Sequence, residues 1–208
     1  MNTTVFLVRH GETDWTRERR LLGQRDIELN ADGLNQAHAT AMALKGVEIA
    51  EVISSPLLRA VQTAEVIGGV CDMEVARDPR LIEMALGRWE GMPYDAALVD
   101  PGYQAFMDDP EESPVPGGER LRDVRDRAAA AVQQALADNP SRSNLIVVSH
   151  ASVIRVLLTH YLGLGLTSFH RLRVSPGSLS ILSFADDREL PRILSINHLT
   201  GTASLPHE

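Results

Sequence analysis

The stretch Val5–Gly11, VFLVRHG, joins an apolar run directly to a cation, an imidazole and a glycine. An uninterrupted apolar run is typical of a buried strand whose two faces are both covered. The turn-rich segment Gly11–Asp14 follows, so Arg9 and His10 stand at the carboxyl end of this strand. Open α/β folds bind their ligands at that edge of the sheet. The stretch therefore predicts a site there that suits an anion and a nucleophilic reaction.

Strand-like and helix-like periods alternate along the rest of the chain. Apolar residues at helical spacing predict helices that open at Asn30, at Ser55-Pro56, near Glu119 and after His150. Short apolar or β-branched runs predict strands at Val5–Val8, Glu51–Ser54, Asn144–Val148, Leu179–Phe184 and Arg192–Ile196. The pattern indicates an α/β fold, a three-layer sandwich in which helices flank both faces of a largely parallel sheet.

Composition and charge limit the classes of protein that remain. The 208 residues are 44% hydrophobic and contain no linker-like shift, which predicts one domain over residues 1–208. The net charge of −8 argues against nucleic acid or an anionic membrane surface as a partner. No apolar stretch approaches the roughly 20 residues of a membrane span, and no signal peptide precedes the first strand, so we expect a cytoplasmic protein. Cys71 is the only cysteine, which excludes an internal disulfide and a multi-cysteine metal site.

One region interrupts the alternation of strands and helices. Between Trp89 and Glu119 the chain contains five prolines, a cluster of acidic residues and several aromatic residues. We expect an insertion of helix and loop, at about residues 92–118, that lies over one end of the sheet. Such a segment is either a lid that selects the substrate or a solvated surface loop.

Three chemically active residues share one topological position, the exit of a strand. His10 and His150 each end a strand, and Arg59 follows another strand in the first turn of a helix. In a parallel sheet these residues can converge on one crevice, where a helix N-terminus and arginine side chains suit a phosphoryl group. Two arginines and a second imidazole can stabilise its charge without magnesium, so we expect neither a metal nor another cofactor. His10 is then the candidate nucleophile, since neighbouring arginines favour its neutral form.

The leaving oxygen of a phosphoester also needs a proton. The segment Arg80–Gly91 carries two candidate carboxylates, Glu83 and Glu90. The residues alone do not choose between them.

Five blocks of this sequence resemble the histidine phosphatase superfamily, which includes the cofactor-dependent phosphoglycerate mutases, in order and spacing over nearly the whole chain. The blocks are Arg9–Thr13, Gly23–Asp26, Ser54–Ala64, Glu83 with Gly87–Gly91, and Val148–His150. The resemblance implies that His10 is phosphorylated, that Arg9, Arg59 and His150 form the phosphate pocket, and that Glu83 rather than Glu90 is the general acid.

The same resemblance implies a phosphate-binding role for the Gly23 turn and for two positions at which this chain departs from the family. Thr16 replaces the usual asparagine and can still donate one hydrogen bond. Ala151-Ser152 replaces the usual Gly-Gly, and Ala151 keeps its backbone N–H as long as its φ stays negative. Neither departure removes a group that takes part in the chemistry.

The compact chain and its Gly87-Arg-Trp-Glu-Gly91 motif resemble the phosphatases of the superfamily more than the mutases. We therefore expect a phosphomonoesterase of the broad-specificity type that acts on a small phosphorylated metabolite. Phosphoglycerate mutase-type transfer and a non-catalytic phospholigand-binding module are the alternatives. An iron site formed by His10, His150 and Glu83 would place Arg9 and Arg59 against a cation, which Coulomb repulsion opposes. A zinc deaminase site would need a Cys-x-x-Cys that one cysteine cannot supply. The sequence leaves the substrate and the oligomeric state open, and it allows a homodimer.

Overall fold

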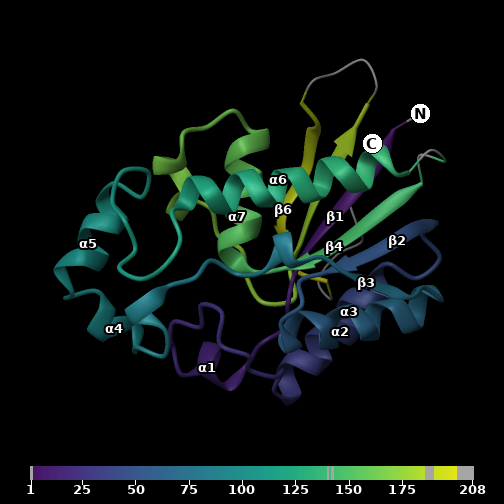
Figure 1. Cartoon of the computed structure of the whole chain (residues 1–208). Coiled ribbons are helices and arrows are strands. Elements are labelled where there is room, and N and C mark those ends of the chain that lie inside the picture. Colours follow the sequence, from purple (N-terminus) through teal and green to yellow (C-terminus); the bar gives the residue numbers. More distant parts are fainter. Residues whose placement is uncertain (1, 140, 142, 186–189, 201–208) are drawn as a thin grey trace.

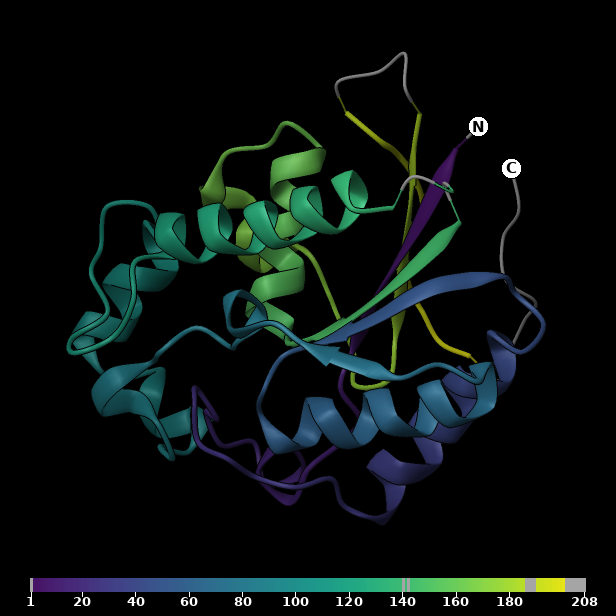
Figure 2. The same cartoon turned by 45° about the vertical axis from the view of Figure 1, so that its right-hand side comes forward.

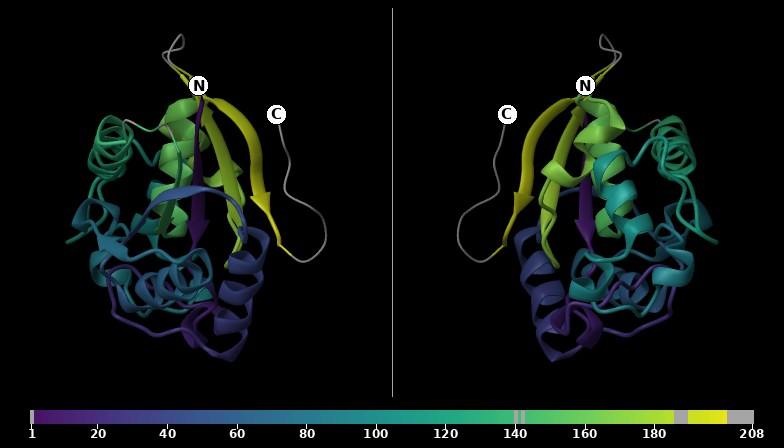
Figure 3. Two further views of the ribbon diagram at one scale, coloured as in Figure 1. Left: turned by 90° about the vertical axis from the view of Figure 1, so that its right-hand side faces the viewer. Right: turned by 90° about the vertical axis from the view of Figure 1, so that its left-hand side faces the viewer.

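A mixed sheet of six strands forms the middle layer of the computed structural model, which describes residues 2–139, 141, 143–185 and 190–200 (Figure 1). The strands lie in the order β3-β2-β4-β1-β5-β6. The first four are parallel, whereas β5 is antiparallel to both β1 and β6, which stands at one edge of the sheet (Figure 3). Their bounds are β1 Thr3–Arg9, β2 Ile49–Ser54, β3 Val75–Arg77, β4 Asn144–Ser149, β5 Leu179–Phe184 and β6 Arg192–His198. The predicted α/β class and largely parallel sheet are confirmed, and β3 is a strand that the sequence did not predict.

Helices cover both faces of this sheet. Figures 1 and 2 show α2 and α3 on one face and α6 and α7 on the other. The α-helices are α1 Asp14–Arg17, α2 Ala31–Ala43, α3 Leu58–Cys71, α4 Tyr94–Ala97, α5 Pro101–Asp108, α6 Leu121–Ala137 and α7 Ala151–Tyr161. Short 3₁₀ helices occupy η1 Pro79–Leu81, η2 Gly87–Trp89 and η3 Leu166–Arg171. Within the described part of the chain, no helix is both long and apolar enough to cross a membrane.

The uninterrupted apolar run of β1 follows from this three-layer arrangement. Successive side chains of a strand point to opposite faces. Val5 and Leu7 therefore pack with α6 and α7, while Phe6 and Val8 pack with α2 and α3. Strand β4 lies between β1 and β2 in the middle of the sheet, so the apolar run of β4 is buried on both faces in the same way.

The start of α3 differs from the prediction. The chain continues the sheet at Ser55, whose N–H donates to Val148 O at 2.9 Å. The helix begins only at Leu58, whose N–H is capped by the Asp26 carboxylate at 2.7 Å. The Ser55-Pro56 pair is therefore not the cap, because Leu57 is the N-cap residue; the Ser55 hydroxyl lies 2.7 Å from His150 Nε2 and accepts from Leu57 N at 3.4 Å. Arg59 still lies in the first turn of α3, as predicted.

The segment 92–118 forms α4, α5 and the turns after them, and Figure 1 shows these helices beyond the carboxyl ends of β1 and β4. The Asp100 carboxylate caps α5 at Tyr103 N, 3.0 Å away, and also accepts from Trp89 Nε1 at 3.3 Å. The buried Trp89 ring meets the Tyr103 ring edge-on, with centroids 5.1 Å apart. These contacts join segment 92–118 to the preceding stretch of the chain, which contains Glu83 and Trp89.

Candidate active site

Three neighbouring strands end at one level, and this brings the distant blocks of the sequence together. Arg9 of β1 pairs with Ser149 of β4, and Ser54 of β2 pairs with Val148. The ladder extends one residue further, because His10 N donates to Ser149 O at 3.0 Å. The His10 and His150 rings therefore lie side by side, with centroids 5.1 Å apart.

The hydrogen bonds of His10 define its orientation. Nδ1 lies 2.7 Å from Gly11 O, which can only accept, so Nδ1 carries the proton. Nε2 accepts a hydrogen bond from Arg59 Nε at 3.2 Å, so its lone pair is on the cavity side of the ring. Burial, followed by the charges of Arg59 and Arg9, holds the pKa of His10 well below its usual value. The imidazole is therefore neutral at pH 7, and its unprotonated Nε2 faces the Arg59 guanidinium.

Arg59 is buried completely, and backbone carbonyls fix its guanidinium. Its Nη1 donates to Arg25 O at 2.6 Å and its Nη2 donates to Gly23 O at 2.8 Å. Both carbonyls belong to the turn after α1. Burial lowers the pKa of Arg59 to about 10, with the Glu83 carboxylate acting in the opposite direction, so the side chain remains a cation at pH 7.

Arg9 and His150 each keep a polar atom unused. Arg9 Nη1 donates to Val174 O at 2.7 Å, while the buried Arg9 Nε has no partner among the described residues. His150 Nε2 lies 2.7 Å from Ser55 Oγ, and its buried Nδ1 is likewise unpaired in the described part of the chain. Burial and then Arg59 lower the pKa of His150. Unpaired buried polar atoms of this kind are commonly functional.

The two candidate carboxylates are in different environments. Glu83 lines the cavity, and its oxygens accept from Met84 N at 2.8 Å and from Ser152 N, at the start of α7, at 3.4 Å. Glu90 instead accepts from Gln24 N at 3.0 Å and pairs with Arg25 at 3.2 Å, so it supports the turn that holds Arg59. Only Glu83 is placed to reach a ligand in this cavity.

Thr16, Gly23 and Ala151 also line the cavity. The Thr16 hydroxyl takes part in a capping box, 2.8 Å from Thr13 N and 2.7 Å from Thr13 Oγ1. It can donate to a ligand when Thr13 is the donor between the two hydroxyls. Ala151 is the first residue of α7 and is not among the residues with positive φ, so its N–H is available without strain.

The cavity has a volume of about 430 Å³, and its wall contains more cationic than anionic side chains. Its wall contains Arg9, Arg19, Arg20, Arg59 and Arg155 but one carboxylate, that of Glu83. Segment 92–118 contributes an aromatic wall that includes Tyr94, Tyr103 and Phe106. The cavity therefore suits a small ligand with more than one negative charge.

Arg155 is a cavity residue that sequence reasoning missed. Its guanidinium lies over the Phe169 ring, with 5.5 Å between Cζ and the ring centroid. Unlike Arg19 and Arg20, which pair with Asp95 and Glu18, it has no hydrogen-bond or ion-pair partner in the described residues. Its position five residues after His150 was the available signal, since that spacing places it on the first turns of the helix that opens at the site.

No group of three or more His, Cys, Asp or Glu side chains within the described ranges is arranged to hold a metal ion.

The chain belongs to the histidine phosphatase superfamily (branch 1), whose family model matches residues 5–198. Among curated relatives, the chain is 35% identical over 203 residues to the probable phosphoglycerate mutase GpmB of Yersinia pestis (strain Pestoides F). That match covers 97% of this chain and 94% of the relative.

Solved structures with the same fold include phosphatases. A mycobacterial glucosyl-3-phosphoglycerate phosphatase in complex with VO3 matches with a TM-score of 0.84 and 30% sequence identity, and the match covers 94% of this chain and 99% of that structure's chain. Phosphoserine phosphatase from Entamoeba histolytica, in complex with 3-phosphoglyceric acid, matches with a TM-score of 0.84 and 27% sequence identity. This match covers 94% of this chain and 96% of the phosphatase chain. The fold and family predicted from the sequence are thus confirmed, and the neighbours support a phosphatase.

Proposed function

We propose that this protein hydrolyses a small phosphorylated metabolite through a phosphohistidine at His10. The observation that carries the proposal is the neutral His10, whose unprotonated Nε2 accepts from Arg59 Nε in the cavity that Arg9 also lines. Such a nitrogen is a nucleophile, and the cations stabilise the equatorial oxygens of a transferring phosphoryl group. The Arg59 N–H directed at Nε2 also occupies the side from which a metal ion would have to bind.

In the first step, His10 Nε2 attacks phosphorus while the bond from phosphorus to the leaving oxygen breaks. Arg59 Nε transfers its hydrogen bond from Nε2 to a phosphoryl oxygen, and Glu83, in its acid form, gives its proton to the leaving oxygen. In the second step, water attacks phosphorus, Glu83 takes a proton from that water, and the bond between phosphorus and Nε2 breaks. One water is consumed, and inorganic phosphate and the alcohol are released.

Mutase activity is a second candidate, favoured by the similarity to a probable phosphoglycerate mutase. The phosphatases among the structural neighbours favour hydrolysis. The two activities give different products from 3-phosphoglycerate, because a phosphatase releases inorganic phosphate and a mutase forms 2-phosphoglycerate. Phosphorus NMR of the reaction mixture separates them.

The remainder of the substrate is proposed to carry a second anionic group. With Arg9 and Arg59 assigned to the phosphoryl group, Arg155 is a further cation at the cavity, and its guanidinium has no hydrogen-bond or ion-pair partner among the described residues. A carboxylate or a second phosphate would pair with it. The solved phosphoserine phosphatase with bound 3-phosphoglyceric acid is a neighbour whose ligand has this chemistry.

Brief reaction with a ³²P-labelled phosphomonoester tests the covalent step. We expect a labelled protein that loses its label in acid and keeps it in base, as a phosphohistidine does. The His10→Ala variant should take up no label. An acid-stable label, or a label that survives this substitution, would contradict the proposal.

A further inference from the structure

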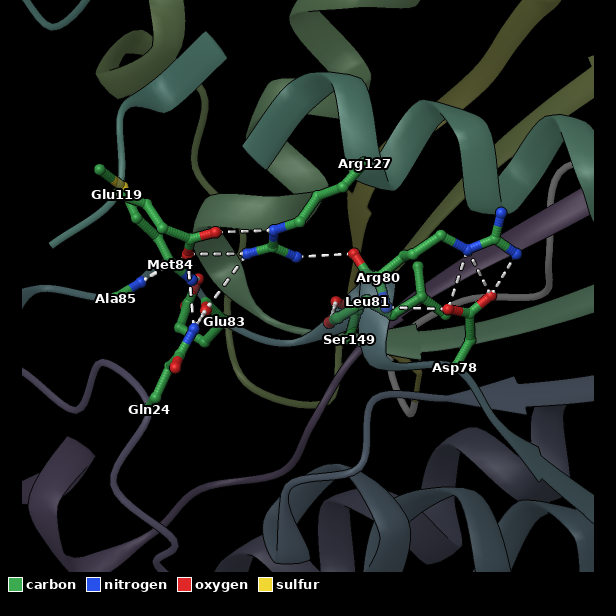
Figure 4. Close-up of polar contacts among 10 residues, drawn as sticks. All are labelled: Gln24, Asp78, Arg80, Leu81, Glu83, Met84, Ala85, Glu119, Arg127 and Ser149. Atoms are coloured by element: carbon green, nitrogen blue, oxygen red, sulfur yellow. Dashed lines mark hydrogen bonds and ion pairs between the residues drawn. The ribbon is translucent and has the colours of Figure 1, made fainter. Parts of the chain in front are cut away.

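The loop that carries Glu83 has an unusual number of side-chain anchors. Between η1 and η2 the chain lacks regular structure, so its backbone groups need partners from elsewhere. Ser149 Oγ donates to Leu81 O at 2.8 Å, and Gln24 Nε2 donates to Glu83 O at 2.9 Å. Figure 4 shows these contacts, with the Asp78–Arg80 ion pair at the far end of the loop.

Arg127 of α6 joins η1 to the first part of this loop. Its Nη1 donates to Arg80 O at 2.6 Å, and its Nη2 donates to Glu83 O at 3.3 Å. One planar guanidinium thus fixes the separation of two carbonyls that lie three residues apart (Figure 4).

Glu119 completes the arrangement from the other side. Its carboxylate accepts from Arg127 Nε at 2.9 Å and Nη2 at 3.1 Å, while Oε2 also accepts from Ala85 N at 2.8 Å. In addition, Glu119 N donates to Ala85 O at 3.0 Å. One bidentate ion pair therefore holds the backbone on both sides of the Glu83 side chain, at Arg80 and Glu83 through Arg127 and at Ala85 through Glu119.

We propose that the Arg127–Glu119 pair is a positioning device for Glu83 and sets the efficiency of proton transfer to the leaving group. The pair touches the backbone of the loop and is absent from the cavity wall, so it acts through Glu83 rather than on the substrate. An exposed ion pair contributes little to stability, but the Arg127 and Glu119 side chains are only 18% and 26% exposed. Besides their ion pair, they make hydrogen bonds to the backbone of Arg80, Glu83 and Ala85 and to the Gln24 side chain (Figure 4). The inference rests on the proposed role of Glu83.

A small displacement of Glu83 should act selectively. A shift of about 1 Å in a group that must transfer a proton can cost up to roughly 100-fold in rate. The loss should be large for an alkyl phosphate, whose alkoxide leaves poorly without a proton, and small for p-nitrophenyl phosphate, whose phenolate leaves unaided. Phosphate binding should be preserved, since Arg9 and Arg59 are held by other contacts.

The experiment compares Arg127→Met, Arg127→Lys and Glu119→Gln with wild type in single-turnover phosphorylation by glycerol 3-phosphate and by p-nitrophenyl phosphate. Arg125→Met is the matched control, because Arg125 is on the same helix and, within the described ranges, pairs only with its neighbour Asp126. Glu83→Gln, measured in parallel, tests the acid itself. Circular dichroism and urea unfolding check that each variant is folded. If Arg127→Met does not fold, Glu119→Gln and Arg127→Lys still test the proposal.

We expect Arg127→Met and Glu119→Gln to lose roughly 10- to 100-fold in phosphorylation by glycerol 3-phosphate and less than about threefold with p-nitrophenyl phosphate. Arg127→Lys should recover part of the loss, and the control should match wild type. Equal losses with both substrates, or no loss in folded variants, would overturn the inference. If Glu83→Gln itself shows no difference between the two substrates, the failure lies in the proposed function instead.

Discussion

Acid should destabilise this protein through its two buried histidines. Burial, followed by nearby arginine charges, holds the pKa values of His10 and His150 well below the usual range, so both rings are neutral in the folded state. In the unfolded chain each ring takes up a proton with a pKa of about 6.5. Below that pH the unfolded state binds more protons than the folded state, so the free energy of unfolding falls as the pH falls.

The size of the effect follows from this difference in protonation. For one histidine that stays neutral in the fold, the free energy of unfolding should fall by about 1.2 kcal/mol between pH 6.0 and pH 5.0. Two such rings give about 2.4 kcal/mol. Other groups also titrate in this range, and a comparison of variants removes their contribution.

Urea unfolding at the two pH values measures these changes in wild type, His10→Gln and His150→Gln. Each substitution removes one titrating ring. Between pH 6.0 and pH 5.0, the free energy of unfolding of each variant should therefore fall by about 1.2 kcal/mol less than that of wild type. His38→Gln, on the exposed face of α2 and away from the cavity, is the control for a His-to-Gln substitution as such. An identical pH dependence in wild type and His10→Gln would show that His10 is not held neutral, and would remove the physical basis for its role as nucleophile.

Three further predictions concern the cavity. Arg155→Gln should lower kcat/KM for O-phosphoserine roughly 10- to 100-fold, which corresponds to the loss of one charged hydrogen bond. The kcat/KM for O-phosphoethanolamine, which lacks the carboxylate, should change by less than about threefold, and equal losses with both substrates would contradict a second anion site. Gly23→Ala should cost roughly 1–3 kcal/mol in urea unfolding, because φ is +50° and the new Cβ would lie 2.4 Å from Glu90 Oε1; unchanged stability would refute this. Vanadate, which mimics the transition state, should inhibit while a metal chelator leaves the rate unchanged, and activity that a chelator abolishes and iron restores would favour the iron site.

The central strands were predictable because their apolar runs are buried on both faces, and this burial leaves a clear signal in the sequence. β3 was missed because it has three residues and lies at the sheet edge, with Ala76 and Arg77 exposed. The start of α3 was misplaced because its cap, Asp26, comes from a distant turn.

The candidate site was predictable where a side chain follows directly from a strand end, as His10 and His150 do. Arg155 was missed although its spacing from His150 places it near the start of the helix that opens at the site. Arg127 was not predictable, because the sequence shows it only as a charged residue on an amphipathic helix. The partners of Arg127 include the backbone carbonyls of Arg80 and Glu83, which carry no sequence signature. The residues alone did not separate the two carboxylates, Glu83 and Glu90; the family resemblance favoured Glu83, and the fold places Glu83 at the cavity and Glu90 against the turn that holds Arg59.

The position of β1 in the sheet has a consequence for how the protein is made. Both of its neighbours, β4 and β5, are encoded in the last third of the chain, at Asn144–Ser149 and Leu179–Phe184. During synthesis on the ribosome, β1 emerges well before both neighbours, and it has neither of them to pair with until more than a hundred further residues have been added. Its apolar run therefore stays without its native partners for most of the synthesis of this domain. The two histidines meet only when β4 is inserted, so an incomplete chain cannot assemble the site.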